Sequence, residues 1–170
     1  QFTRFAGADL SSDIKAEARL SGPLPELLRS IDELFRVHIT AESDIKAADV
    51  EIRRPDYPIV ALQQLLRNAI LHRSYQGTNA PVRVNWFEDR IEIQNPGGPF
   101  GQVTIQNFGE PGLTDYRNSH LADAMKILGY VQRFGVGIAT AQKALKDNGN
   151  PELEYDVQAG HTLAIVRRHQ

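Results

Sequence analysis

Apolar residues recur every three or four positions in four segments, a spacing that predicts four amphipathic helices. The first opens at Pro23 and Pro25, and proline suits a first turn because its missing N–H would have no partner there. Its inward positions are predicted to be Leu27, Leu28, Ile31, Leu34 and Phe35. The other three helices are expected after Asp56-Tyr57-Pro58 as far as about His72, over His120–Leu128, and after Gly135-Val136-Gly137 as far as about Asn148-Gly149-Asn150.

Strict alternation of apolar and polar residues marks the predicted strands. Residues 82–86 and 90–94 alternate on either side of Glu88-Asp89 and indicate a β-hairpin. Residues 153–157 and 162–167 indicate a closing pair of strands. A shorter strand is expected from Phe2 to about Gly7, with a turn at Ser11–Asp13.

Two stretches lack a clear period. Thr40–Arg54 is mixed, with Val50 and Ile52 suggesting a brief strand. Residues 100–118 are rich in Gly, Asn and Pro and are expected to form a long loop. Hairpins with helices between them predict a two-layer α/β sandwich, a single domain over residues 1–170 with a mixed, mainly antiparallel sheet and helices on one face.

Composition narrows the function classes. The 170 residues are 41% hydrophobic and 24% charged, which fits a globular domain, and the net charge of -2 argues against nucleic-acid binding by the whole surface. A local basic patch stays open. The absence of cysteine excludes disulfides, thiolate nucleophiles and Cys-based zinc sites. The sequence shows no membrane-spanning run and no leader, and it starts at Gln1, so we expect a cytoplasmic fragment of a longer protein.

A polar stripe on the second predicted helix is the first chemical candidate. Gln64, Asn68 and His72 lie at i, i+4 and i+8, so they share one side of that helix. Such a stripe is typical of a polar border between core and solvent. It is also what a ligand site on a helix requires, and the amide oxygen of Asn68 is a hard oxygen of the kind that Mg²⁺ prefers.

Two glycine motifs are further candidates. Asn95-Pro96-Gly97-Gly98 follows a strand, where it indicates either a sharp turn or a backbone that approaches a ligand closely. Gly135-Val136-Gly137 precedes a helix, where it indicates either an entry loop or an anion site at the positive end of the helix dipole. No Gly-Lys-Ser/Thr follows, so this is no Walker-type phosphate loop, and Thr140 departs from the dinucleotide fingerprint.

Other enzyme classes lack their signatures. The five histidines show no HExxH or related ligand spacing, which argues against a zinc enzyme. A Gly-x-Ser-x-Gly elbow for a serine hydrolase is also missing.

The order of these motifs resembles the GHKL (Bergerat) ATP-binding fold of gyrase, histidine kinases and MutL. It is closest to a divergent branch found beside Schlafen/AlbA-type domains in transcriptional regulators and RecG-related helicases. The likeness is carried by Tyr57-Pro58 with Ala61-Leu62, Arg67–Tyr75, Asp89–Gly98, Arg117-Asn118 and Leu128–Ile138, and the entry segments Arg4–Gly7 and Ser21–Leu24 fit as well.

The resemblance implies a role for each matching position. Asn68 would coordinate Mg²⁺ that bridges the triphosphate. Asn95 would replace the Asp that reads the adenine amino group, with Gly97 leaving room for the base. Thr162 would lie near the adenine.

The remaining positions would serve the phosphates. Arg117 and Asn118 end the loop that would act as a phosphate lid, and Gly135 and Gly137 would offer backbone N–H groups. Gln64 stands where the fold has the Glu that activates water, and because an amide cannot act as a general base, hydrolysis is expected to be weak or absent.

We therefore expect an ATP- and Mg²⁺-binding regulatory module of a DNA-associated transcriptional regulator. Its expected partners are a second copy of the chain, as a homodimer, and DNA through flanking domains. Two alternatives stay open at this point: a structural or dimerisation module that has lost the ligand, and a slow ATPase.

Overall fold

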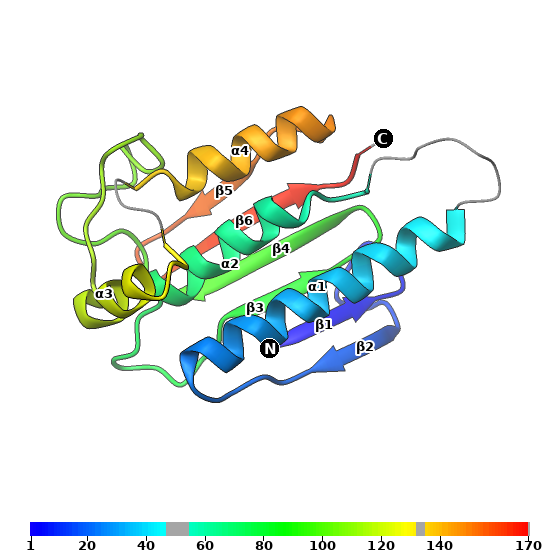
Figure 1. Cartoon of the computed structure of the whole chain (residues 1–170), viewed down its shortest axis with the longest axis horizontal. Coiled ribbons are helices and arrows are strands. Elements are labelled where there is room, and N and C mark those ends of the chain that lie inside the picture. The colour runs from blue at the N-terminus through cyan, green and yellow to red at the C-terminus, as the bar shows by residue number, and fades with distance from the viewer. Residues whose placement is uncertain (47–54, 132–134, 170) are drawn as a thin grey trace.

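The computed structural model describes residues 1–46, 55–131 and 135–169. They form a six-stranded sheet with helices over one face (Figure 1). The strands are β1 (Phe2–Phe5), β2 (Ile14–Ala18), β3 (Arg83–Trp86), β4 (Arg90–Pro96), β5 (Glu154–Val157) and β6 (His161–Arg167). The helices are α1 (Leu24–Lys46), α2 (Ile59–His72), α3 (Ser119–Ile127) and α4 (Gly137–Asn148). Among these described helices, none has the length and apolar character needed to span a bilayer.

The sheet is mixed and mainly antiparallel, with the strand order β2-β1-β3-β4-β6-β5. Every neighbouring pair is antiparallel except β1 and β3, which run parallel. The central strand β4 alternates between buried Ile91, Ile93 and Asn95 on the helical side and half-buried residues on the other side. This alternation fixes the register, because a slip by one residue would turn the isoleucines to the open face.

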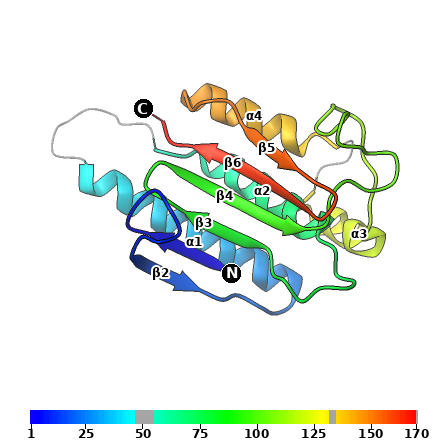
Figure 2. The ribbon, with the colours of Figure 1, turned by 180° about the vertical axis from the view of Figure 1, so that it is seen from behind.

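Helix α2 lies at the centre of the helical layer, between α1 and α4 and over β4 (Figure 1). Its buried side chains are Ala61, Leu62, Leu65, Leu66, Ala69, Ile70 and Leu71. Seen from behind, the opposite face of the sheet carries no helix (Figure 2). The fold is therefore the two-layer α/β sandwich that the sequence pattern predicts.

An aromatic cluster around Trp86 closes the core between α1 and the sheet. The Trp86 ring lies 5.4 Å from Tyr57 in an edge-to-face arrangement and 6.3 Å from Phe2. Phe35 of α1 is fully buried against the same cluster. Such edge contacts add about 0.5–1.5 kcal/mol per pair to the burial of the rings.

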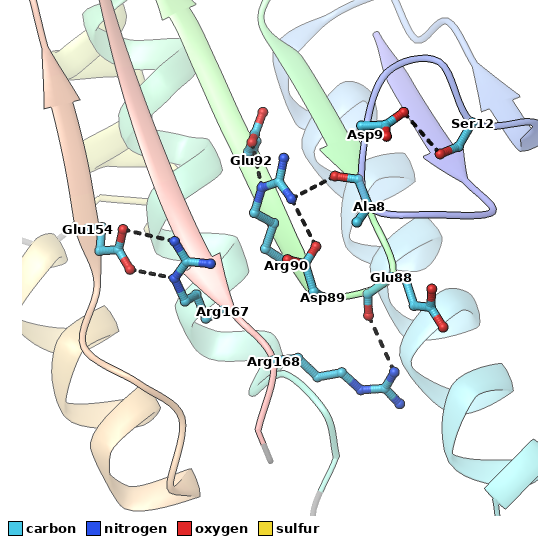
Figure 3. Close-up of polar contacts among 10 residues, drawn as sticks. All are labelled: Ala8, Asp9, Ser12, Glu88, Asp89, Arg90, Glu92, Glu154, Arg167 and Arg168. Carbon is cyan, nitrogen blue, oxygen red and sulfur yellow. Dashed lines mark hydrogen bonds and ion pairs between the residues drawn. The ribbon is translucent and has the colours of Figure 1, made fainter.

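The open face of the sheet is covered by ion pairs at one end (Figure 3). Arg90 contacts Asp89 at 2.9 Å and Glu92 at 2.7 Å, and it also donates to the carbonyl of Ala8. Arg167 donates to Glu154 at 2.6 Å. The Arg90 guanidinium also lies 4.2 Å over the ring of Phe87. These pairs partner the guanidinium groups of Arg90 and Arg167 with carboxylates and keep that end of the face polar.

Most predicted elements are confirmed within one or two residues: the hairpin, the closing strands, α3, α4 and the long loop that joins β4 to α3. Three differences stand out. The short first strand ends at Phe5, strand β2 was not predicted, and α1 continues to Lys46, into the stretch expected to be mixed. Strand β2 forms by pairing with β1. Its own sequence, Ile14–Ala18, has only isoleucine and alanine as apolar residues and is mostly exposed at the edge of the sheet. The brief strand expected at Val50 and Ile52 lies outside the described residues.

We expect Ile91→Ala to lower the free energy of unfolding by about 2–5 kcal/mol, because Ile91 is fully buried in β4 and the substitution leaves a cavity. The control is Ile14→Ala at the exposed sheet edge, with an expected loss below about 1 kcal/mol. Urea unfolding followed by the emission of Trp86 measures both. Equal losses would contradict the assignment of β4 as the centre of the core.

Candidate functional site

One cavity, here called the central cavity, lies between α2, the adjoining ends of β4 and β6, the start of α4, and the loop at residues 97–118. Each of these elements contributes to the lining: Gln64, Asn68 and His72 come from α2, Asn95 and Thr162 from the two strands, Gly135 and Gly137 from the start of α4, and Thr114 and Asp115 from the loop. Segments far apart in the sequence therefore meet at a single site.

The polar stripe of α2 meets the first residue of α4. A Cβ placed on Gly137 would lie 3.3 Å from Gln64 Oε1 and 3.6 Å from Asn68 Oδ1. Glycine thus lets the α4 backbone approach both amides. In the part of the chain that the structure describes, the side chains of Gln64 and Asn68 form no hydrogen bond, so their polar atoms are available to a ligand.

The end of β4 forms the opposite wall. Asn95 is only 4% exposed and pairs with Thr162 across the β4–β6 ladder. The Asn95 Nδ2 donates to the carbonyls of Pro96 (3.2 Å) and Gly97 (3.3 Å), and the Thr162 hydroxyl also donates to the Gly97 carbonyl at 3.2 Å. With its N–H groups engaged in this way, Asn95 presents its amide oxygen, a hydrogen-bond acceptor, as the remaining polar atom.

The loop at residues 97–118 covers the cavity and is held at its neck. The Tyr116 ring stacks on His72 at 5.7 Å, and Asn118 Nδ2 donates to the carbonyls of Leu71 and Arg73 at 2.8 Å each. Arg117 donates to the carbonyl of Gly98 at 3.2 Å. The loop therefore joins the C-terminus of α2 to the end of β4.

The structure brings five of the eight predicted site residues to the central cavity: Asn68, Asn95, Gly135, Gly137 and Thr162. Gly97 and Arg117 line a neighbouring cleft instead. Gly97 has φ +94°, and a Cβ there would lie 3.0 Å from Ser74, so this position faces the α2–β3 connection. Asn118 lines neither and binds the end of α2.

Several lining residues were not predicted, because they lie on the irregular loop. Phe100, Phe108 and Thr114 have no periodic signal that would reveal their contacts. Phe108 packs edge-on against Tyr155 of β5 at 5.0 Å. Arg67 lines the cavity beside Asn68, pairs with Asp32 of α1 at 3.1 Å, and lies 5.2 Å from the ring of Tyr130.

Burial shifts two titratable groups at the cavity. Burial of the ring, and secondarily the nearby Arg117 guanidinium, lower the pKa of His72 from 6.5 to about 4. His72 is therefore neutral at pH 7. Burial also raises the pKa of the Tyr155 hydroxyl, which keeps it protonated.

The donor set does not form a metal centre by itself. Among the described residues, no group of three or more His, Asp or Glu side chains lies close enough to hold an ion. The amide of Asn68 offers one hard oxygen, so an Mg²⁺ ion here would need the phosphate oxygens of a ligand and water as its other ligands.

Comparison with known proteins defines the class. A family model described as "Putative ATP-dependent DNA helicase recG C-terminal" matches residues 79–166, just over half of the chain, and the chain belongs to this family, whose domains are HATPase-like. The match includes Asn95, Gly135, Gly137 and Thr162 but begins after Asn68. A search of curated proteins gave no match.

A solved structure shows the same fold. The DIP2311 protein from Corynebacterium diphtheriae superposes with a TM-score of 0.78 at 20% sequence identity. The superposition covers 99% of this chain and 33% of that one, so the chain spans about a third of the length of this structural relative.

Because the native pKa of His72 lies below its unfolded value, the folded state binds fewer protons between pH 6.5 and 4. The contribution of this pKa difference to the free energy of unfolding is complete above pH 6.5 and is lost as the pH falls toward 4. Between pH 7 and pH 5 the loss is about 2 kcal/mol. His72→Phe keeps an aromatic ring against Tyr116 and should remove this part of the pH dependence. Urea unfolding of both proteins at pH 7 and pH 5 measures it, and an identical loss in the variant would contradict the buried, neutral His72.

Proposed function

We propose that the central cavity binds ATP with Mg²⁺ and that the nucleotide regulates the module rather than being turned over rapidly. The observation that carries this proposal is the convergence of Asn68, Asn95, Gly135-Gly137 and Thr162 on one cavity in a chain of an ATPase-like family.

The β4 end of the cavity suits the base. Asn95 is buried, and its N–H groups bond to the carbonyls of Pro96 and Gly97, so its amide oxygen can accept a hydrogen bond. An acceptor at this point matches the 6-amino group of adenine and mismatches the 6-oxo group of guanine. A neutral acceptor binds more weakly than a carboxylate would. The Thr162 hydroxyl, whose proton is donated to Gly97, adds acceptor lone pairs beside it.

The α4 end suits the phosphates. Gly135 and Gly137 lie at the start of α4, where the first-turn N–H groups have no intrahelical partners and the helix dipole is positive. Asn68 would supply an oxygen to Mg²⁺, which would complete its shell from phosphate and water. Arg67, next to Asn68, also lines the cavity, and its guanidinium is paired with Asp32. We propose that Gly97, Arg117 and Asn118 act indirectly, by holding the lid loop and the strand end in place.

The central cavity is poorly suited to ATP hydrolysis. Gln64 lies against Gly137 and faces the cavity, but its amide cannot take a proton from water. A bound nucleotide would therefore persist and act by favouring one conformation, in proportion to its difference in affinity between states. In the full protein, this would regulate a DNA-associated transcriptional regulator, with DNA bound by flanking domains and a second copy of the chain as a partner.

Titration calorimetry with Mg-ATP tests the binding. We expect a saturable signal for the native chain, a weaker one with Mg-GTP, and a loss of at least about tenfold in affinity in Asn68→Ala, because the metal loses its protein oxygen. The matched control is Asn85→Ala on the open face of the sheet, which should bind like the native chain. Thermal unfolding confirms that both variants fold.

The rival proposal, a structural or dimerisation module without a ligand, predicts a different result. Asn68→Ala would then change stability alone, and millimolar Mg-ATP would give neither heat nor a thermal shift in the native chain. That outcome would contradict the proposal that the central cavity binds ATP.

Restoring the carboxylate tests the hydrolysis argument. We expect Gln64→Glu to raise phosphate release from Mg-ATP by at least about tenfold, since a general base contributes roughly 10²–10⁴-fold. Gln63→Glu makes the same charge change one residue away, outside the cavity lining, and should have no effect. If the native chain already releases phosphate and Gln64→Glu adds nothing, Gln64 is not what limits turnover and the chain is a slow ATPase.

A further inference from the structure

A second cleft lies beyond the end of β4, separated from the central cavity by the Pro96–Gly98 turn. Its walls are the α2–β3 connection at residues 74–81 and the β5–β6 turn at residues 159–161, which lie at the same end of the sheet (Figure 2). The side chains that define the second cleft are Ser74, Thr78, Arg83, Gln94, Arg117 and His161. Among the residues that the structure describes, this lining contains two arginines and a histidine and no carboxylate.

The strand register explains how these groups meet. Arg83 pairs with Gln94 across β3 and β4, and Pro96 pairs with His161 across β4 and β6. Arg83 alternates with the buried Val84, so it lies on the open face of the sheet, where it is exposed. Arg83 on β3 and His161 on β6 therefore lie on either side of the last residues of β4, Gln94 and Pro96.

Arg117 adds a second guanidinium group from the loop. It is half-buried, and its guanidinium lies 4.9 Å over the ring of Phe100. One N–H group donates to the carbonyl of Gly98, while Nε is buried without a hydrogen-bond partner in the described part of the chain. A buried donor that lacks a partner is costly, and an anion in the cleft would relieve that cost.

The two ends of the open face differ in how their arginines are paired. At the far end, Arg90 and Arg167 bind carboxylates (Figure 3). At the cleft end, the side chains of Arg83 and Arg19 have no ion pair within residues 1–46, 55–131 and 135–169.

Two carboxylates lie near the second cleft, and they occupy only some of the groups that an anion in the cleft would bind. Asp156 contacts His161 at 3.6 Å, and Glu17 accepts a hydrogen bond from the side chain of Gln1 at 3.4 Å. Neither contacts Arg83 or Arg117. The second cleft thus keeps a positive charge in a chain whose net charge is -2.

The geometry points to the second cleft as a phosphate-binding site, distinct from the central cavity. Guanidinium groups bind phosphate with two parallel N–H bonds, and the Gln94 amide and the Thr78 hydroxyl provide further donors. The phosphate has two chemical sources, a free phosphate group or the phosphodiester backbone of a single-stranded nucleic acid. The inference does not depend on nucleotide binding in the central cavity.

Two probes and three variants test the inference. Sodium phosphate is titrated by calorimetry at constant ionic strength, and a fluorescein-labelled thymidine oligonucleotide is titrated by anisotropy over a range of salt concentrations. Arg83→Gln removes the exposed cation of the cleft. Arg167→Gln is the matched control, because it removes the same charge from an exposed position at the other end of the same face. Asn68→Ala reports binding in the central cavity.

We expect Arg83→Gln to weaken binding of the probe roughly tenfold, since charge-assisted hydrogen bonds are lost, while Arg167→Gln and Asn68→Ala bind like the native chain. If the oligonucleotide binds more tightly than phosphate, Arg83→Gln should also flatten the slope of log Kd against log salt by about 0.7, which identifies a phosphodiester chain. Equal binding of both probes identifies a single-phosphate site.

Two results would overturn the inference. In one, neither probe binds, or Arg167→Gln weakens binding as much as Arg83→Gln, so that only general charge matters. In the other, Asn68→Ala abolishes phosphate binding and Arg83→Gln does not, which would place the anion in the central cavity. Mg-ATP binding, measured in parallel, should be unchanged in Arg83→Gln, so failure here is separable from failure of the proposed function.

Discussion

The hydrogen bonds at the end of β4 determine how the rest of the site is arranged. Gly97 N–H donates to the carbonyl of Gly160 at 2.8 Å, and Ser74 N–H donates to the carbonyl of Pro96 at 2.7 Å. Three connections, those after α2, β4 and β5, are thereby joined at one point. A Cβ on Gly98 would come within 2.0 Å of the Gln158 carbonyl, so only glycine permits this approach. The turn that results separates the central cavity from the second cleft.

Helix α2 serves the core and the site with two adjacent faces. Its leucines pack against the sheet and the flanking helices, while Gln64, Asn68 and His72 line the central cavity. The buried face fixes the rotation of the helix, and this rotation aims the polar stripe. The site is therefore positioned by core packing, since no described residue makes a hydrogen bond to the amides of Gln64 and Asn68.

Local pattern was enough to predict most elements, and it singled out Asn68, Asn95, Gly135 and Gly137 at the cavity, whereas Thr162 was expected only from the family resemblance. The i, i+4, i+8 spacing on α2 and the glycines before α4 can be recognised in the sequence, because regular helices impose such positions. Contacts of the irregular loop cannot be derived in this way: Tyr116 reaches His72, and Phe108 reaches Tyr155, through tertiary folding alone. Gly97 shows the same limit. The motif predicted a sharp turn or a close approach to a ligand, but the side that Gly97 faces depends on Ser74, more than twenty residues earlier.

The hydrogen bonds that join the two ends of the loop at residues 97–118 affect how such domains can change in evolution. Gln102 N–H donates to Asp115 at 3.2 Å, and its side chain donates to the Thr114 carbonyl, so the two ends of the loop are joined beside the cavity. The entropy of closing a loop grows only slowly with its length, by about 0.6 kcal/mol per doubling. Insertions between Gly101 and Leu113 are thus cheap in stability, and the entrance to the site can be reshaped over evolution while the scaffold beneath it stays the same.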